Sequence, residues 1–352
     1  MLFPYQYVPH KMEKMQEFID FIFYEVWCKA PASGPFGLNL FDANADLREV
    51  MQAFYYSDAQ GADFFYGHVE RIYDLFSALT VAQVDQFKQW YQANNSLEKV
   101  CANDPTAPLA RYVDIAVNYK DLADQLGTFF KGLYSKSLLD LAALREKIGE
   151  IGDHYRAFVQ VNKDEKCPFC GIGGIKGSHH SKREAYDHYL PKALYPFNSI
   201  NFRNLAPACH ECNSTYKLSK DPARNPAGRR KAFYPFAAAG QTIHIHVVLQ
   251  HCDIENLKPA DVQMHFGPAA VFEEIETWKD VYGIEERYKA KLCGEHDGKY
   301  WLCQVLDEYR NCDKLPADIL AMRARQAQSH PYAECNFLRK PFLDACQHIG
   351  VL

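Results

Sequence analysis

Long apolar runs are missing from this 352-residue sequence, because no stretch reaches the ~18 uncharged apolar residues that a membrane-spanning helix needs. The opening MLFPYQYVPHKMEKMQ lacks a basic segment followed by an apolar one, so we expect no secretory signal. Internal repeats and low-complexity tracts are lacking as well. We therefore expect a cytoplasmic globular protein without a membrane partner, in a compartment that keeps thiols reduced.

The whole chain has no large excess of positive or negative charge, since its formal net charge is −5. This average argues against a uniformly basic nucleic-acid binder. The charge is unevenly spread, however. Residues 1–160 carry 14 Lys and Arg against 21 Asp and Glu, residues 161–235 carry 13 against 6, and residues 236–352 carry 12 against 17. A basic centre between acidic flanks indicates a local polyanion site.

The same three ranges differ in their predicted structure. Residues 1–160 show helical periodicity over 12–26, 64–79, 84–91, 109–134 and 137–159, and we interpret the many aromatic residues there as core and not as base-stacking surfaces. This helical domain is a partner-binding module or a scaffold. Residues 241–249 alternate as a half-buried strand, and helical patterns return from about residue 271. We therefore predict an α+β protein with a helical domain (1–160), a central core (161–235) and a mixed C-terminal region (236–352).

Two Cys-x-x-Cys pairs, Cys167–Cys170 and Cys209–Cys212, lie in the basic centre. Each pair turns two thiolates toward one point, and two pairs supply the four sulfurs of a tetrahedral zinc site. A redox dithiol would need only one pair. Four sulfurs leave no open coordination position, so we expect a structural Zn²⁺. The other eight cysteines have no such spacing, and we predict buried free thiols: Cys28, Cys101, Cys252, Cys293, Cys303, Cys312, Cys335 and Cys346.

Polar residues suited to phosphodiester chemistry lie between and just after these pairs. Asp187 and Asn213 offer oxygen ligands for a hard divalent cation, and the imidazole of His188 accepts a proton near neutral pH. Adjacent residues of a regular strand point to opposite faces, so Asp187 and His188 serve one site only if the strand ends or bulges there. Pro191, three residues later, is consistent with an ending strand.

The combination of the cysteine pairs with Asp187-His188, Asn204 and Asn213 resembles the HNH nuclease motif in its zinc-stapled form. The resemblance covers about residues 167–221. It implies a treble-clef ββα-metal core that cuts DNA with one Mg²⁺ or Mn²⁺. By position, His188 resembles the general base, Asp187 and Asn213 the metal ligands, and Asn204 the residue that holds the hairpin loop. The last motif position is Asn and not His, a variant that occurs among active members.

Basic residues around the motif are expected to contact phosphates of double-stranded DNA: Lys182, Arg183, Lys192, Arg203 and Lys217. A weaker resemblance, which extends through Trp278, Tyr282-Gly283 and Arg287-Tyr288, is to HNH proteins of Septu-type and retron-linked phage-defence systems. It implies an ATPase or other defence subunit as a partner. Two alternatives stay open: a treble-clef module that binds nucleic acid without cutting it, and a nuclease subunit that is active only with an ATPase partner.

Overall fold

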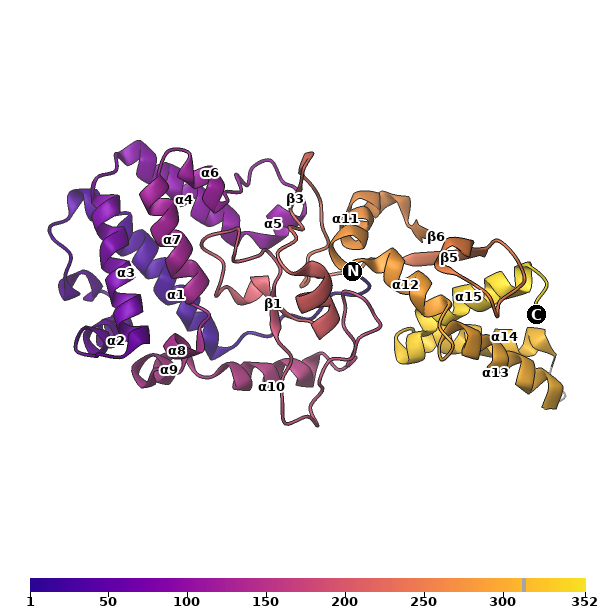
Figure 1. Cartoon of the computed structure of the whole chain (residues 1–352). Coiled ribbons are helices and arrows are strands. Elements are labelled where there is room, and N and C mark those ends of the chain that lie inside the picture. Colours follow the sequence, from indigo (N-terminus) through magenta and orange to yellow (C-terminus); the bar gives the residue numbers. More distant parts are fainter. Residues whose placement is uncertain (312–314) are drawn as a thin grey trace.

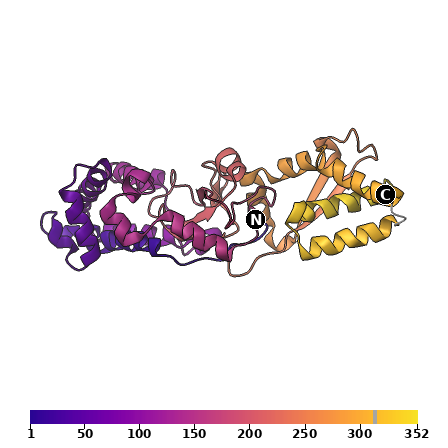
Figure 2. The same ribbon diagram turned by 90° about the horizontal axis from the view of Figure 1, so that it is seen from below.

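The computed structural model describes residues 1–311 and 315–352. It is elongated and has three successive parts: a helical lobe, a centre with little regular structure, and a second lobe of helices with one hairpin (Figure 1). The view from below shows the same succession (Figure 2). The structure thus agrees with the predicted mixed α+β class. None of the helices in the described ranges has the length and hydrophobicity of a transmembrane segment.

The N-terminal lobe packs short helices around an aromatic core in which Trp27, Phe76 and Phe129 are fully buried. Burial of these rings agrees with their interpretation as core. The helices predicted over 64–79 and 84–91 are confirmed. The α-helices of this lobe are α1 (Lys14–Phe21), α2 (Ala45–Tyr55), α3 (Gln60–Ser77), α4 (Val81–Asn95), α5 (Leu97–Cys101), α6 (Tyr112–Ala116), α7 (Lys120–Gly132), α8 (Lys136–Leu139), α9 (Ala142–Ile148) and α10 (Ile151–Val161).

The observed helices of this lobe differ from the predicted ones in three ways. The range 109–134 is divided into α6 and α7, because Tyr119 leaves the helical region (φ −138°, ψ 60°). The range 137–159 is divided into α8, α9 and α10, and Gly149 takes a positive φ of 77° between the last two. Helix α2 was not predicted, although its buried residues Leu47, Val50 and Phe54 recur at helical spacing.

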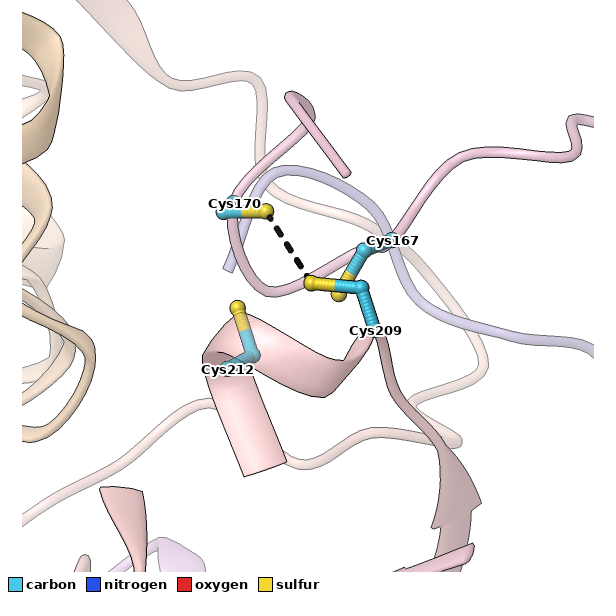
Figure 3. A group of neighbouring side chains, drawn as sticks. All are labelled: Cys167, Cys170, Cys209 and Cys212. Atoms are coloured by element: carbon cyan, nitrogen blue, oxygen red, sulfur yellow. Dashed lines mark hydrogen bonds between the residues drawn. The ribbon is translucent and has the colours of Figure 1, made fainter. Parts of the chain in front are cut away.

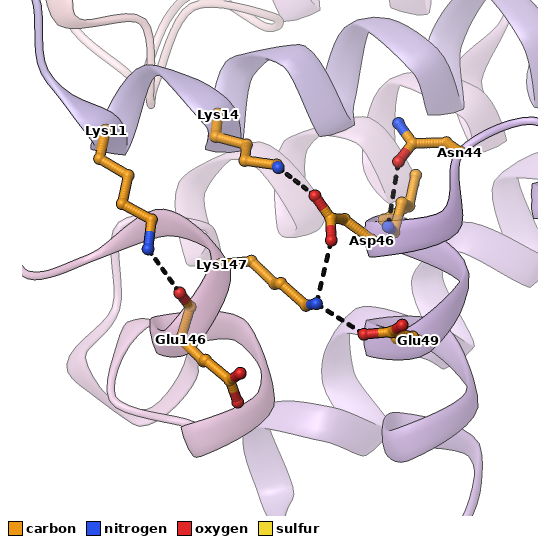
Figure 4. A network of polar contacts seen from close by, with 8 residues as sticks. Lys11, Lys14, Asn44, Asp46, Glu49, Glu146 and Lys147 are labelled. Carbon is orange, nitrogen blue, oxygen red and sulfur yellow. Dashed lines mark hydrogen bonds and ion pairs between the residues drawn. The ribbon is translucent and has the colours of Figure 1, made fainter.

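A polar network joins α1, α2 and α9 at the edge of the lobe (Figure 4). Asp46 accepts hydrogen bonds from Lys14 and, at 2.9 Å, from Lys147 Nζ, which also donates to Glu49 at 2.6 Å. These side chains are partly exposed, so water and salt screen their attraction. We infer that the network orients the three helices relative to one another and contributes little to the free energy of unfolding.

The centre holds four very short strands in two antiparallel pairs and one short π-helix. Strand β1 (Tyr186–His188) pairs with β2 (Leu205–Pro207), and β3 (Arg224–Asn225) pairs with β4 (Gly228–Arg229). The π-helix η6 (Glu211–Lys217) follows β2 and ends before Asp221-Pro222, as predicted.

The C-terminal lobe packs one hairpin against helices. Strand β5 (His244–Leu249) matches the predicted strand, with Val247 and Leu249 buried, and β6 (Val262–Gly267), which was not predicted, pairs with it. The helices begin at Phe272, close to the predicted position. They are α11 (Phe272–Tyr282), α12 (Ile284–Leu292), α13 (Gly298–Asn311), α14 (Pro316–Ser329) and α15 (Asn336–His348).

The first residues of the chain bind to the centre of the molecule. Figure 1 places the N-terminus in the middle of the molecule. The Leu2 amide donates to Pro168 O at 2.9 Å, and the Tyr5 hydroxyl donates to Pro207 O at 3.0 Å. One cluster of buried apolar residues runs through all three parts. Buried apolar residues thus continue across residues 160 and 235, and the division into three domains stays a prediction.

The prediction for the eight remaining cysteines was correct only in part. Cys101, Cys335 and Cys346 are buried, whereas Cys252 and Cys303 are exposed. Cys28 and Cys293 are partly buried, and Cys312 lies outside the described residues. Spacing alone does not distinguish a cysteine on the inner face of a helix from one on the outer face.

Helix α10 contacts β1 through His154, whose Nδ1 shares a hydrogen bond with the Tyr186 hydroxyl. Burial, and then the charge of His10, lowers the pKa of His154 to about 4. The unfolded chain protonates this residue near its ordinary pKa of 6.5. Stability from the neutral imidazole is therefore complete above pH 6.5 and is lost as the pH falls toward 4.

We expect this one group to lower the free energy of unfolding by about 2 kcal/mol between pH 7.5 and pH 5.0. Urea unfolding at the two pH values measures the loss in the wild type and in His154→Gln, which still accepts a hydrogen bond from Tyr186. The variant should lose about 2 kcal/mol less than the wild type. Equal losses in both proteins would contradict this origin of the acid sensitivity.

Candidate metal and nuclease site

The candidate site is built on the β1–β2 hairpin and on η6. The strands pair in a regular register, with Tyr186 opposite Pro207 and His188 opposite Leu205. The chain between them forms a long loop that folds back on the hairpin. After β2, the second cysteine pair leads directly into η6, so two strands and one helix surround the polar motif residues.

Asn204 holds the hairpin loop in place. Its Oδ1 accepts a hydrogen bond from the Leu190 amide at 2.7 Å, and its Nδ2 donates to Leu190 O at 3.1 Å and to Asn198 O at 3.2 Å. Asn204 is fully buried, so replacing it would leave these backbone groups without partners, at a cost of about 1–3 kcal/mol for each group.

His188 ends β1 with its ring held from two sides. Nε2–H donates to the Ser199 carbonyl at 2.9 Å, and because a carbonyl only accepts, this bond assigns the proton to Nε2 and leaves Nδ1 as the basic nitrogen. The Tyr134 ring lies edge-on to the imidazole, with centroids 5.0 Å apart. Burial, and then the charges of Lys192 and Lys217, lowers the pKa of His188 to about 3. The imidazole is therefore neutral at pH 7, as a proton acceptor must be.

Asp187 points to η6 and is almost completely buried. Its Oδ1 accepts a hydrogen bond from Lys217 Nζ at 2.8 Å, and the same Nζ donates to His188 O at 2.8 Å. Burial raises the pKa of Asp187, although the charge of Lys217 opposes that effect. The other oxygen, Oδ2, is buried with no hydrogen-bond partner. A carboxylate oxygen left in this state fits a hard cation such as Mg²⁺ or Mn²⁺.

The strand alternation at Asp187 and His188 is retained. The ladder is regular through His188, and the two side chains meet different partners, Lys217 on η6 for one and Ser199 and Tyr134 for the other. The strand ends at His188, as its position before Pro191 suggested. Asn213 lies on η6, is partly exposed and precedes Lys217 by four residues, so both residues lie on the helix that Asp187 faces.

The four cysteines of the predicted zinc site come together (Figure 3). Their Sγ atoms all lie within 4.8 Å of one another, and all four residues are buried. The Gly173 amide donates to Cys170 Sγ at 3.3 Å, and a Cβ on Gly173 would lie 2.5 Å from Cys209 Sγ. Four converging thiols fit Zn²⁺ in a structural site. Elsewhere in the described ranges, no three His, Cys, Asp or Glu side chains converge in this way.

The five basic residues predicted to contact phosphate have different environments. Lys182, Arg183 and Arg203 are exposed, and the Arg203 guanidinium lies 4.3 Å from the Tyr7 ring centroid. Lys192 is partly buried and donates to Lys131 O at 3.0 Å. Lys217 is fully buried against Asp187. Lys217 therefore does not fit the predicted surface contact with phosphate, because its buried charge pairs with Asp187.

Sequence reasoning missed Tyr134 and Ser199, the two residues that contact the His188 ring. Tyr134 lies between α7 and α8, and its buried hydroxyl has no hydrogen-bond partner. Ser199 acts through its backbone carbonyl, which every residue carries. Tyr134 is far from the motif along the chain, and a backbone carbonyl does not depend on the residue type. Neither contact therefore leaves a pattern in the sequence.

The chain is similar to two known proteins over short segments. It is 36% identical over 66 residues to Septu protein PtuB from Bacillus thuringiensis, which covers 18% of this chain and 24% of that protein. It is 46% identical over 54 residues to Protein ea31 from Escherichia phage lambda, which covers 15% of this chain and 16% of that protein. The chain thus spans a quarter or less of each relative. No protein-family model and no solved structure matches.

Proposed function

We propose that this protein is a metal-dependent HNH endonuclease that hydrolyses phosphodiester bonds of double-stranded DNA. One observation carries the proposal: a neutral histidine whose Nε2–H is held by a backbone carbonyl ends the strand that also bears a buried aspartate with an unpartnered oxygen. A treble-clef ββα-metal core around them is part of the same proposal. It is supported by the hairpin, the following helix and the four converging cysteines.

The residues divide the chemistry among them. Asp187 Oδ2 and the Asn213 side chain would hold Mg²⁺ or Mn²⁺, which supplies charge neutralisation at the phosphate and the leaving oxygen. His188 Nδ1 takes the proton of the attacking water, while the Ser199 carbonyl keeps the imidazole in place. Lys217 holds the other Asp187 oxygen in place. The exposed Lys182, Arg183 and Arg203, together with Lys192, contact the DNA backbone.

We also propose that the protein acts in phage defence, with an ATPase or another defence subunit as a partner. The resemblance of its motifs to nuclease subunits of such systems supports this context, and so does the partial similarity to a Septu protein. The alternative is a module that grips nucleic acid without cutting it. The ion pair that engages Asp187 Oδ1 favours this alternative, because it reduces the oxygens free for a cation.

Cleavage of supercoiled plasmid and linear duplex DNA tests the proposed function. We expect cutting with Mg²⁺ or Mn²⁺ and none with EDTA, by the chain alone or together with a co-purified partner. Salt-sensitive DNA binding without cleavage, with every divalent ion tried and with the partner present, would establish the binding module instead.

A further inference from the structure

A segment of the C-terminal lobe, Trp278–Tyr288, lies directly on the first cysteine pair. Trp278 Nε1 donates to Phe169 O at 2.5 Å, and the Tyr288 hydroxyl donates to Cys170 O at 2.9 Å. The Tyr282 ring stacks on Phe169, with centroids 4.8 Å apart and planes 17° apart. Phe169 lies between the two cysteines, so these contacts hold the backbone that aims both thiols.

The same segment also contacts the second cysteine pair and η6. Arg287 Nη1 donates to Cys212 Sγ at 3.2 Å, and the guanidinium lies 4.7 Å from the Tyr216 ring centroid. Gly283 has a positive φ of 59°, and a Cβ there would lie 2.3 Å from the Tyr216 ring. A glycine is thus needed for the approach of α11 and α12 to η6, the helix that bears Asn213 and Lys217.

Charge explains why an arginine is suited to this position. Four thiolates around one Zn²⁺ carry a net charge of −2, and burying that charge is costly unless donors and cations compensate it. A guanidinium that donates to a thiolate supplies both a hydrogen bond and a positive charge. Such outer contacts orient metal ligands and typically change metal affinity by about 10- to 100-fold.

We propose that residues 278–288 form the outer shell of the zinc site, with Arg287 as its charge-compensating residue, so that zinc fastens the C-terminal lobe to the centre. This role concerns assembly of the molecule and does not depend on DNA cleavage. Arg230 of the centre also forms a 2.6 Å ion pair with Asp280 of this segment.

The first test compares zinc release from Arg287→Gln, Arg287→Lys and the exposed control Arg310→Gln. Zinc content is measured on the purified chains, and transfer to a coloured chelator gives the release rate. We expect about 10-fold or faster release from Arg287→Gln, partial recovery in Arg287→Lys, and wild-type behaviour in Arg310→Gln. Wild-type content and release rate in Arg287→Gln would overturn the proposal.

The second test needs no variant, so it holds even if Arg287→Gln does not fold. Hydrogen exchange is measured on the wild-type chain with zinc and after its removal by a chelator. Amides of residues 278–288 should lose protection together with those around the cysteines, while α3 keeps its own. Unchanged protection of residues 278–288, or an equal loss throughout α3, would overturn the proposal. The first test measures zinc content and release, and the second measures hydrogen exchange. Both therefore stay informative even if no nuclease activity is found.

Discussion

Replacing His188 with alanine is expected to slow DNA cleavage by about 100- to 10,000-fold, the range that a general base contributes. The reason is geometric and electrostatic together. The Ser199 carbonyl accepts the hydrogen bond from Nε2–H, so Nδ1 is the nitrogen that would accept the proton of water in the proposed reaction. The lowered pKa keeps that nitrogen unprotonated at pH 7, and it also makes the imidazole a weaker base, which places the effect toward the lower end of this range. Single-turnover cleavage with saturating enzyme measures the chemical step.

Two variants separate the chemistry from the packing around His188. His188→Asn retains an N–H donor for the Ser199 carbonyl but provides no base, so it should be as slow as His188→Ala. His180→Ala removes an exposed histidine close to the motif and should cut at the wild-type rate. DNA affinity should change little in all three variants. Wild-type cutting by His188→Ala would remove this residue from the mechanism.

Loss of the zinc site is expected to have the largest effect on stability. Structural Zn²⁺ contributes about 10–16 kcal/mol of apparent binding energy in zinc-finger peptides, as much as the whole stability of an ordinary domain. The four buried thiols lie where the N-terminal segment, η6 and the C-terminal lobe meet, so much of the central core depends on them. Cys209→Ser should therefore contain less than one zinc per chain, and its centre should not fold.

Metal analysis and urea unfolding followed by circular dichroism measure this effect. The matched control is Cys303→Ser, which changes an exposed cysteine of α13 and should keep both zinc and stability. Full zinc content in Cys209→Ser, or unfolding indistinguishable from the wild type, would show that the four sulfurs do not form one metal site.

The Asp187–Lys217 pair shows how the basic centre is used inside the molecule. Isolated buried charges are costly, and removing one partner of a buried pair typically destabilises by about 3–5 kcal/mol. Lys217 compensates Asp187 and also donates to the backbone at the end of β1. One of the positive charges of residues 161–235 therefore organises the candidate site itself. The exposed Lys182, Arg183 and Arg203 remain available for a polyanion.

The sequence alone determined the features that depend on short spacings. Two residues between paired cysteines bring two thiols together, so each pair was predictable from its spacing, whereas the meeting of the two pairs depends on the fold. Asp187-His188 and Asn204 were singled out by the resemblance of their pattern to the HNH motif. The periodicity of α3 and α4 and the alternation along β5 also depend only on neighbouring residues, and these elements form where they were predicted.

Only the tertiary structure decided which distant residues complete the site. Tyr134 lies against His188, Lys217 is buried on Asp187 30 residues away, and Arg287 donates to Cys212 across 75 residues. A residue type indicates a charge or a ring but not whether packing places it at the surface or inside. That choice depends on the burial energy of whole helices, which short patterns along the chain do not record.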